Sequence, residues 1–127
     1  MLELAGPSVD VLGDVPDVGA VFAGARVAVY PGRTGRGTKN TVGESVGAGC
    51  PVVASVESAR GHATGEHLRT GSTDEEIARA VVELLVDPDA ARRAREACVI
   101  AAAAQTNWDD VAERYVALLR AAVDSHG

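Results

Sequence analysis

The chain has 127 residues, of which 46% are hydrophobic and 3% aromatic, and its 12 basic and 18 acidic residues give a formal net charge of −6. This length fits one domain with a modest core, and the acidic balance with so few rings argues against a nucleic-acid partner. The longest apolar run, Cys98 to Ala104, is far too short to cross a bilayer, so no transmembrane segment is expected.

The N-terminal part is predicted to contribute one strand and one short helix. Residues 1–6 fit the last turn of a helix that Gly6 ends, or a stray strand. Val9 to Leu12 predict a strand. Asp17 is expected to cap a short helix, Val18 to Ala23, whose apolar residues would cover the sheet.

The segment from Arg26 to Ser55 is predicted to form a parallel strand–helix–strand unit. Val27 to Tyr30 and Pro51 to Ala54 lack polar alternation, which is typical of strands buried on both faces. Between them, Thr38 to Ala48 is long enough for the crossover helix, with Thr38 as its cap. The sequence therefore predicts an α/β fold with a parallel sheet and flanking helices.

The loop before this helix has the composition of an anion-binding site. Its glycines and cations are Gly32, Gly35, Gly37, Arg33, Arg36 and Lys39. A helix N-terminus with free backbone N–H groups attracts anions, so phosphate or diphosphate is the ligand that this loop favours. The alternative is an ordinary glycine-rich turn with solvated charges, because such turns are common.

A P-loop is a second alternative for the same loop. Gly32 to Gly37 supply G-x-x-x-x-G after a strand, but the motif then needs Lys followed by Ser or Thr. Here Thr38 precedes Lys39 and Asn40 follows it. No later predicted strand ends in an acidic residue of the Walker B type, so a nucleoside-triphosphatase is not favoured.

After the second strand, the chain is predicted to be a polar loop and then helices. Val56 to Gly71 is the loop, with a short strand at Glu66 to Arg69. Ser72 to Glu75 form a capping box, and Asp87 with the following proline starts a helix that reaches about Ala104.

The predicted helices carry apolar stripes that we interpret as core packing. The first stripe comprises Ile77, Ala80, Val81, Leu84 and Leu85, and that of the last helix comprises Trp108, Val111, Tyr115, Leu118 and Ala122. Thr106 or Asn107 is expected to cap the last helix. Arg92, Arg93 and Arg95 are interpreted as a solvated face, with acidic lipid or a partner as the alternative.

The cysteines and histidines predict no special site. Cys50 and Cys98 lie far apart among apolar residues, which favours buried thiols in a reducing cytosol and hence a cytoplasmic protein. Met1 is not followed by the pattern of a secretory signal. No metal site is expected, because His62, His67 and His126 lack partners at ligand spacing and are each interpreted as surface residues.

Taken whole, the central segment resembles the donor-binding segment of glycosyltransferase family 4, enzymes of the GT-B fold. The pattern from Pro31 to Ala54 is P-x-R-x-G-x-G-T-K-N-x-V-x-E-x-x-x-x-G-x-P-V-V-A. The likeness extends upstream through Val11 to Asp17 and downstream to Trp108. It implies a single Rossmann-like domain over residues 1–127, equivalent to an incomplete GT-B C-terminal domain, the one that binds nucleotide sugars.

The resemblance also implies the site residues. In the family, the glutamate at the position of Glu44 binds the ribose hydroxyls of a nucleoside diphosphate sugar, and backbone amides of the preceding loop meet the diphosphate. The implied set is Val15, Arg33, Gly35, Arg36, Gly37, Thr38, Lys39 and Glu44. Arg36 stands where many members have a second glutamate. A solvated helix residue is the alternative for Glu44, and a mobile surface loop is the alternative for the weaker candidates Ser58, Arg60 and His62.

The function implied is transfer of a sugar from this donor to an acceptor, without metal or cofactor; the catalytic residues stay unassigned. A non-catalytic nucleotide-binding or scaffold protein is the alternative. In the family, two further central strands lie between the equivalents of Val9–Leu12 and Arg26–Tyr30, and this chain starts after them. We therefore expect a homodimer or a partner chain that carries the acceptor domain, unless the two flanking strands pair directly.

Overall fold

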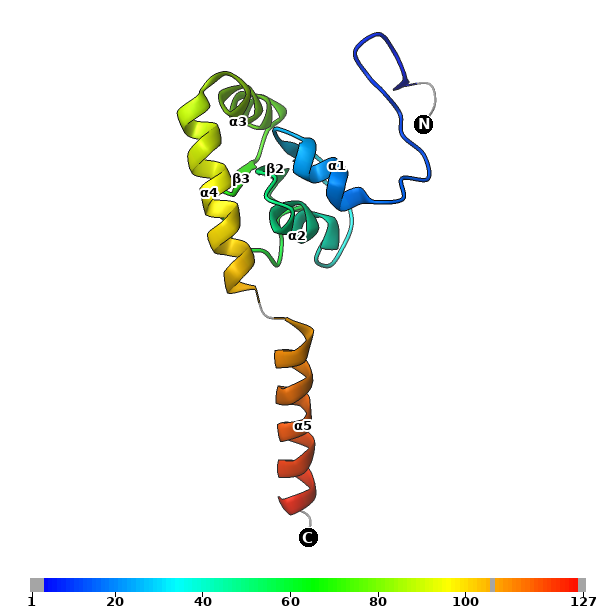
Figure 1. Cartoon of the computed structure of the whole chain (residues 1–127), viewed down its shortest axis with the longest axis vertical. Helices are drawn as coiled ribbons and strands as arrows, with labels where there is room; N and C mark the ends of the chain where they lie inside the picture. Colours follow the sequence, from blue (N-terminus) through cyan, green and yellow to red (C-terminus); the bar gives the residue numbers. More distant parts are fainter. Residues whose placement is uncertain (1–3, 106, 126–127) are drawn as a thin grey trace.

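A three-stranded parallel sheet forms the centre of the computed structural model, which describes residues 4–105 and 107–125 (Figure 1). The strands β1 (Ala28–Tyr30), β2 (Val52–Ser55) and β3 (Leu68–Gly71) lie in the order β1-β2-β3. Ala28 pairs with Val52 in the first register, and Val52 pairs with Leu68 in the second. The predicted α/β fold with a parallel sheet is confirmed, and β3 lies slightly later than its predicted span.

The helices cover both faces of β2, whose four residues are all buried. Alternate β2 residues point to opposite faces, as in any strand. Val52 and Ala54 pack against α2 (Asn40–Gly47), whereas Val53 packs against α3 (Asp74–Val86). The long helix α4 (Pro88–Ala104) contributes Cys98 to the first cluster and Ala90 and Ala94 to the second. α4 therefore ties the two layers together.

The caps predicted at Asp17 and Asp87 are found as expected, and the predicted capping box lies a residue later. The Asp17 carboxylate accepts from Ala20 N at 3.1 Å and starts α1 (Val18–Gly24). Asp87 accepts from the backbone N–H groups of Asp89 and Ala90 and both ends α3 and starts α4. The predicted capping box is displaced, because Thr73 is the cap of α3 and Glu76 accepts from Ser72 N at 2.6 Å.

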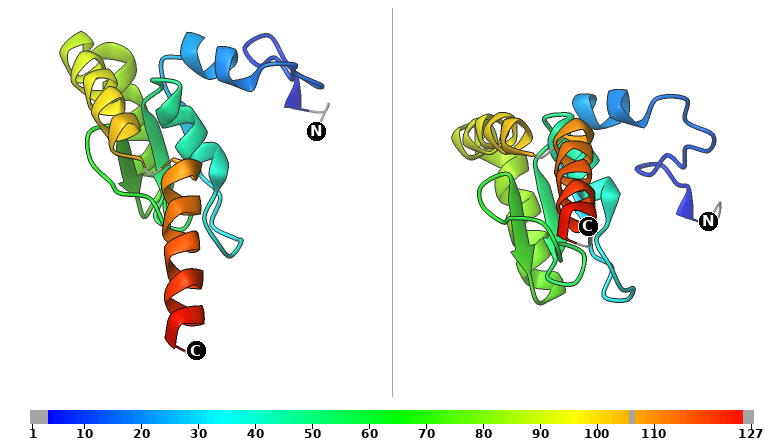
Figure 2. Two further views of the ribbon diagram at one scale, coloured as in Figure 1. Left: turned by 60° about the horizontal axis from the view of Figure 1, so that its bottom comes forward. Right: turned by 90° about the horizontal axis from the view of Figure 1, so that it is seen from below.

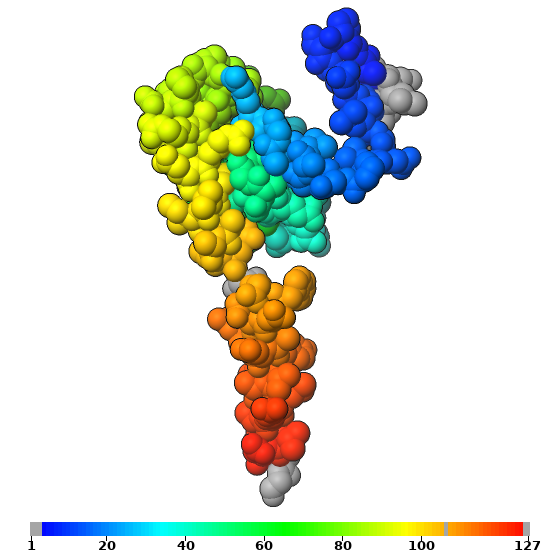
Figure 3. Space-filling view, in the orientation of Figure 1, coloured from blue at the N-terminus to red at the C-terminus, as the bar shows by residue number. Residues whose placement is uncertain are grey.

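The predicted strand at Val9–Leu12 is wrong. These residues form no ladder with β1 or any other strand, and only a single bridge joins Gly6 to Val9. Val9 and Leu12 are exposed, because residues 4–16 stand away from the sheet (Figures 1 and 3). Among the described residues β1 therefore pairs only with β2, and its other edge is open. Part of the predicted N-terminal helical turn, residues 1–3, lies outside the described residues.

α1 does not cover the sheet as expected. It contacts α2 instead and has no buried residue; its valines Val18 and Val21 stay 46% and 42% exposed. Figure 2 shows α1 at the end of the sheet opposite the loop that follows β1.

The core-packing interpretation of the last helix is also wrong. α5 (Trp108–Ser125) has no buried residue and projects from the body (Figures 1 and 3). Asn107 caps it by accepting from Asp110 N at 2.9 Å; the other predicted cap, Thr106, lies outside the described residues. The predicted amphipathic helix does form. However, α4 ends at Ala104 and α5 then points away from the body, so its apolar face does not pack on the core.

Arg95, one of the three arginines assigned to a solvated face, does not lie on such a face. It is half-buried and donates to the carbonyl oxygens of Ala25 at 2.7 Å and Gly49 at 3.3 Å. Its guanidinium therefore ties α4 to the two turns that precede β1 and β2. Arg92 is exposed as expected and pairs with Asp89 and Glu96 on its own helix.

Both cysteines are free and fully buried, as predicted. Burial raises the pKa of the Cys98 thiol to about 11, and the neighbouring Cys50 adds to this while Arg95 opposes it. Burial raises the pKa of Cys50 as well. The folded state therefore holds the Cys98 proton more tightly than the unfolded chain, in which a thiol titrates near about 8.5.

We expect alkali to destabilise the protein through Cys98. The stability conferred by the protonated thiol is fully present below the unfolded pKa and is lost as the pH rises through the folded pKa, by about 2–3 kcal/mol in all. Urea unfolding at pH 8 and pH 11 measures the loss. Cys98→Ala keeps every other titrating group, so its loss should be smaller by that amount, and equal losses in both proteins would contradict the assignment.

Candidate functional site

The glycine-rich loop, residues 31–39, lies at the carboxyl end of β1 and leads into α2 (Figure 2). Gly35 and Gly37 have φ of +108° and +94°, a region that other residues rarely adopt. The carbonyl oxygen of Gly32 accepts from two hydroxyls, Ser55 Oγ at 2.6 Å and Ser58 Oγ at 2.8 Å. The loop is therefore fastened to the residues at the end of β2.

A second contact sets α2 against β1. The Tyr30 hydroxyl lies 2.7 Å from Ser45 Oγ and donates to the Thr41 carbonyl oxygen at 3.0 Å. The predicted cap Thr38 is wrong, since α2 begins at Asn40 and its N-cap residue is Lys39, whose side chain makes no capping bond. The first backbone N–H groups of α2 thus have no capping side chain, and these are the groups that bind anions.

The three cations of the loop, Arg33, Arg36 and Lys39, differ in their contacts. Arg33 points to the start of α3, where it donates to the Ser72 carbonyl oxygen at 2.6 Å and to the Asp74 carboxylate at 2.7 Å. Hydrogen bonding to Asp74 raises the pKa of the Arg33 guanidinium above its ordinary value. Lys39 Nζ lies over Gly35, 3.7 Å from where a Cβ would stand. Within the described part of the chain, Arg36 and Lys39 form no ion pair.

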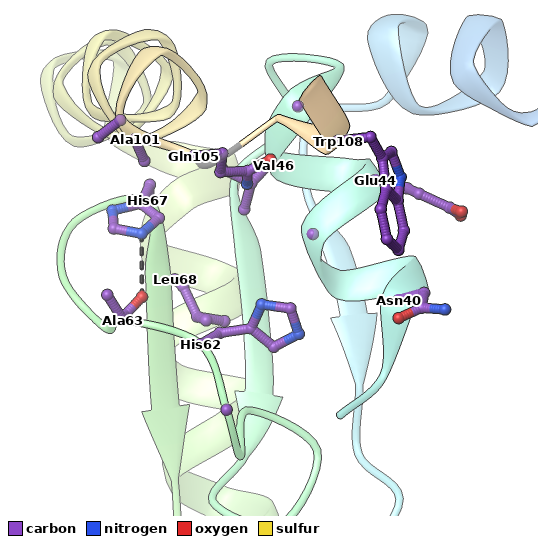
Figure 4. A pocket seen from close by; sticks show the side chains of 14 residues that line it. Asn40, Glu44, Val46, His62, Ala63, His67, Leu68, Ala101, Gln105 and Trp108 are labelled. Atoms are coloured by element: carbon purple, nitrogen blue, oxygen red, sulfur yellow. Dashed lines mark hydrogen bonds between the residues drawn. The ribbon is translucent and has the colours of Figure 1, made fainter. Parts of the chain in front are cut away.

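A groove of about 820 Å³ runs along α2 beside this loop (Figure 4). Asn40 and Glu44, one turn apart, supply one wall, and Leu68 and Val46 belong to its apolar part. Its complete lining is Asn40, Gly43, Glu44, Val46, Gly47, Gly61, His62, Ala63, His67, Leu68, Ala101, Ala104, Gln105 and Trp108. The groove thus combines a carboxylate, amides and imidazoles with an indole, which suits a ligand with hydroxyls and a ring.

The histidines of the groove correct the surface interpretation. His62 and His67 are half-buried. The His62 ring Nε2 lies 2.9 Å from the Lys39 carbonyl oxygen and ties the loop after β2 to the start of α2. His67 Nε2 lies 3.0 Å from the Ala63 carbonyl oxygen (Figure 4). The third histidine, His126, lies outside the described residues.

Most of the predicted site residues come together, but not all. Glu44 and His62 line the groove, and residues 35–39 lie at its end, with Thr38 against Gly61. Val15 does not line the groove; it precedes α1, and no strand at Val9–Leu12 carries it toward the loop. Ser58 is buried beneath the loop, and Arg60 is exposed.

The groove also contains residues that the sequence analysis did not assign to it. Trp108 lies on the same side of α2 as Glu44 and Asn40 (Figure 4). Ala101, Ala104 and Gln105 come from the end of α4. The only sequence signal was the match of Trp108 to a family motif; its place depends on the direction in which α5 leaves the end of α4, which no local pattern sets.

In residues 4–105 and 107–125, no group of three His, Cys, Asp or Glu side chains could hold a metal ion. In the same part of the chain, no helix is both long and apolar enough to span a membrane.

Comparison with known proteins gives one finding. A family described as "Glycosyl transferases group 1" matches residues 1–87, which include the loop, α2 and β3. No curated protein and no solved structure matches the chain.

Proposed function

Because the chain belongs to the group 1 glycosyl transferases, a family that transfers sugars, we propose that it binds a nucleoside diphosphate sugar as the donor-binding part of such an enzyme. In this proposal residues 1–127 act as one domain. The observation that carries it is the juxtaposition of the glycine-rich loop, residues 35–39, which leads into an uncapped helix start, with a groove that Glu44 lines.

The diphosphate would lie at the start of α2. The uncapped N–H groups there, the left-handed Gly35 and Gly37, and the Lys39 ammonium over Gly35 support this position. Arg36 adds charge from the same loop. Arg33 contributes only if the ligand competes with Asp74 for its guanidinium, so we place it at the edge of the site.

The ribose would lie in the groove. A carboxylate accepts from two hydroxyls at once, and Glu44 is exposed there with Asn40 one turn before it. Trp108 borders the same groove with 85% of its surface exposed, which leaves its indole available to a ring of the ligand.

The reaction would be transfer of the donor sugar to an acceptor with departure of the nucleoside diphosphate. Amides of Gly37 and Thr38, with Lys39, would stabilise the charge that develops on the leaving diphosphate. The acceptor groups would come from a further domain or a partner chain, and the open edge of β1 offers a place for it to pair.

Glu44→Ala should weaken a nucleoside diphosphate by about 1–3 kcal/mol, because hydrogen bonds to a charged group are lost. Pyrophosphate, which has no ribose, should bind as before. Titration calorimetry at low salt with uridine and guanosine diphosphates, and with pyrophosphate, measures both affinities. Absence of heat with every nucleotide at millimolar concentration would remove the donor-site proposal.

Two control variants sharpen this experiment. Glu44→Gln keeps the shape of the side chain and should give an intermediate loss, since one acceptor oxygen remains. Glu96→Ala removes an exposed carboxylate from α4, outside the groove, and should leave the affinity unchanged. If Glu44→Ala weakens pyrophosphate and nucleotide equally, Glu44 acts through the fold rather than on the ribose.

A further inference from the structure

His62 reaches the groove from the loop that follows β2, and contacts with the backbone fix its ring. Gly61 before it has a φ of +86° and lies against Thr38. The ring Nε2 of His62 lies 2.9 Å from the Lys39 carbonyl oxygen. A carbonyl oxygen only accepts hydrogen bonds, so the neutral ring carries its proton on Nε2. Nδ1 is therefore left as a hydrogen-bond acceptor.

The described residues offer this acceptor no partner. The hydrogen bond of the His62 ring is made by Nε2, the other ring nitrogen. In the described part of the chain, every solvent-shielded side-chain nitrogen or oxygen of the residues that are not exposed has a hydrogen-bond partner. Since His62 is half-buried and its Nδ1 has no such partner, Nδ1 is not shielded and can be reached from the groove that His62 lines.

α2 leaves room for this ring. Gly43 stands in the middle of the helix, where glycine is a poorer helix former than alanine. A Cβ on Gly43 would lie 3.3 Å from His62 Cε1 and 3.8 Å from His62 Nδ1. At 3.3 Å two carbon atoms are closer than their best separation of about 3.5–4.0 Å, so an alanine would press on the ring. The imidazole thus packs on a part of α2 that has no side chain.

The chemistry of the acceptor limits what it can contact. The oxygens of an ionised diphosphate only accept hydrogen bonds, whereas a sugar hydroxyl can donate one. Figure 4 shows Glu44, the residue proposed for the ribose, directed away from His62 with Trp108 beside it, whereas His62 is on the side of α2 where Leu68 lies. A nucleoside diphosphate sugar extends in two directions from its diphosphate, so the side of His62 is left for the sugar.

We propose that His62 Nδ1 accepts a hydrogen bond from a hydroxyl of the sugar that the donor carries, an inference that rests on the proposed function. With the diphosphate at the start of α2, the nucleoside lies on the side of Glu44 and the sugar on the side of His62. The two ring nitrogens then have separate roles. Nε2 holds Lys39, the residue before α2, and Nδ1 binds the sugar.

The second histidine of the groove supplies a matched control. His67 Nε2 lies 3.0 Å from the Ala63 carbonyl oxygen, so His67 also keeps Nδ1 as an acceptor. However, His67 precedes β3, at the amino end of the parallel sheet, whereas the glycine-rich loop follows β1 at the carboxyl end. A sugar attached to a diphosphate at this loop does not reach His67.

Amide substitutions separate the two nitrogens of His62. Glutamine can place its amide nitrogen near the position of Nε2, so His62→Gln keeps a donor for Lys39 and removes the acceptor. We expect it to weaken UDP-glucose and GDP-mannose, whichever the wild type binds, about three- to tenfold, as for one hydrogen bond. Its affinities for UDP, GDP and pyrophosphate should not change. His62→Asn is too short to reach Lys39 and should weaken pyrophosphate as well, whereas His67→Gln should weaken none of these ligands.

Titration calorimetry at pH 8 measures these affinities, and far-UV circular dichroism confirms that the variants are folded. If His62→Gln weakens UDP or GDP as much as the sugar nucleotides, His62 acts through the loop and the proposal is wrong. Unchanged affinity for the sugar nucleotides, or a wild type that binds UDP or GDP but neither sugar nucleotide, also overturns it. These outcomes leave the donor-site proposal standing; that proposal fails when the wild type binds no nucleotide at all.

Discussion

Replacement of Leu84 by alanine is expected to lower the free energy of unfolding by about 3 kcal/mol, within the range for buried leucines of about 2–5 kcal/mol. Leu84 is 1% exposed and packs with Val53 of β2 and with Ala90 and Ala94 of α4. The substitution leaves a cavity between α3 and the sheet. Urea unfolding followed by far-UV circular dichroism measures the loss, a large part of a typical domain stability of about 5–15 kcal/mol.

The neighbouring residue supplies the control for this prediction. Leu85 has the same side chain on the same helix but is 43% exposed. Leu85→Ala should therefore lower the unfolding free energy by less than about 1 kcal/mol. Equal losses at the two positions would show that α3 does not pack through Leu84.

Gly61→Ala is expected to affect both the fold and the ligand site. Gly61 has a φ of +86°, so alanine would be strained by about 1–2 kcal/mol. A Cβ at this position would overlap Thr38 Oγ1 and lie 3.2 Å from Thr38 Cβ. Overpacking of this kind costs about 1–3 kcal/mol more. Relief requires Thr38 to move, so the amides of the loop should lose their alignment and pyrophosphate affinity should fall.

The variant Gly49→Ala is a control that separates the effect of backbone strain from that of the contact with Thr38. Its φ is +79°, yet a Cβ there would meet nothing within 4 Å. Gly49→Ala should thus show the strain alone and leave pyrophosphate binding unchanged. Unfolding and calorimetry of both variants provide the comparison, and identical effects at Gly61 and Gly49 would mean that the contact with Thr38 has no importance.

Much of the fold was predictable because its determinants are local. The apolar runs around β1 and β2, the carboxylates of Asp17 and Asp87, and the spacing of Ile77 and Leu84 each act within a few residues. Two of the wrong predictions, the strand at Val9–Leu12 and the packing of α5, depend on whether another segment lies beside these residues. An apolar pattern says that a face should be covered, but it does not say whether the chain itself covers it.

The site shows the same division. In a parallel strand–helix–strand unit, chain order alone places the loop at the carboxyl end of the sheet, and it lies there. Glu44 follows one turn after the start of α2. The pairing of Arg33 with Asp74 and the position of Val15 involve segments far apart or unpaired, so no pattern near those residues predicted them. The place of Trp108 beside the groove likewise depends on the direction in which α5 leaves α4.

The central position of β2 has a consequence for synthesis on the ribosome. Its Ala54 face meets α2, which has already left the ribosome when β2 emerges. The face that carries Val53 stays uncovered until α3 and α4 have been made, because the residues that cover it come later in the chain: Ile77, Leu84, Ala90 and Ala94. During that interval the nascent chain presents an uncovered apolar strand, a species prone to aggregation. Slow translation before α3 and α4 have emerged from the ribosome would prolong the exposure, whereas slow translation after their emergence would not.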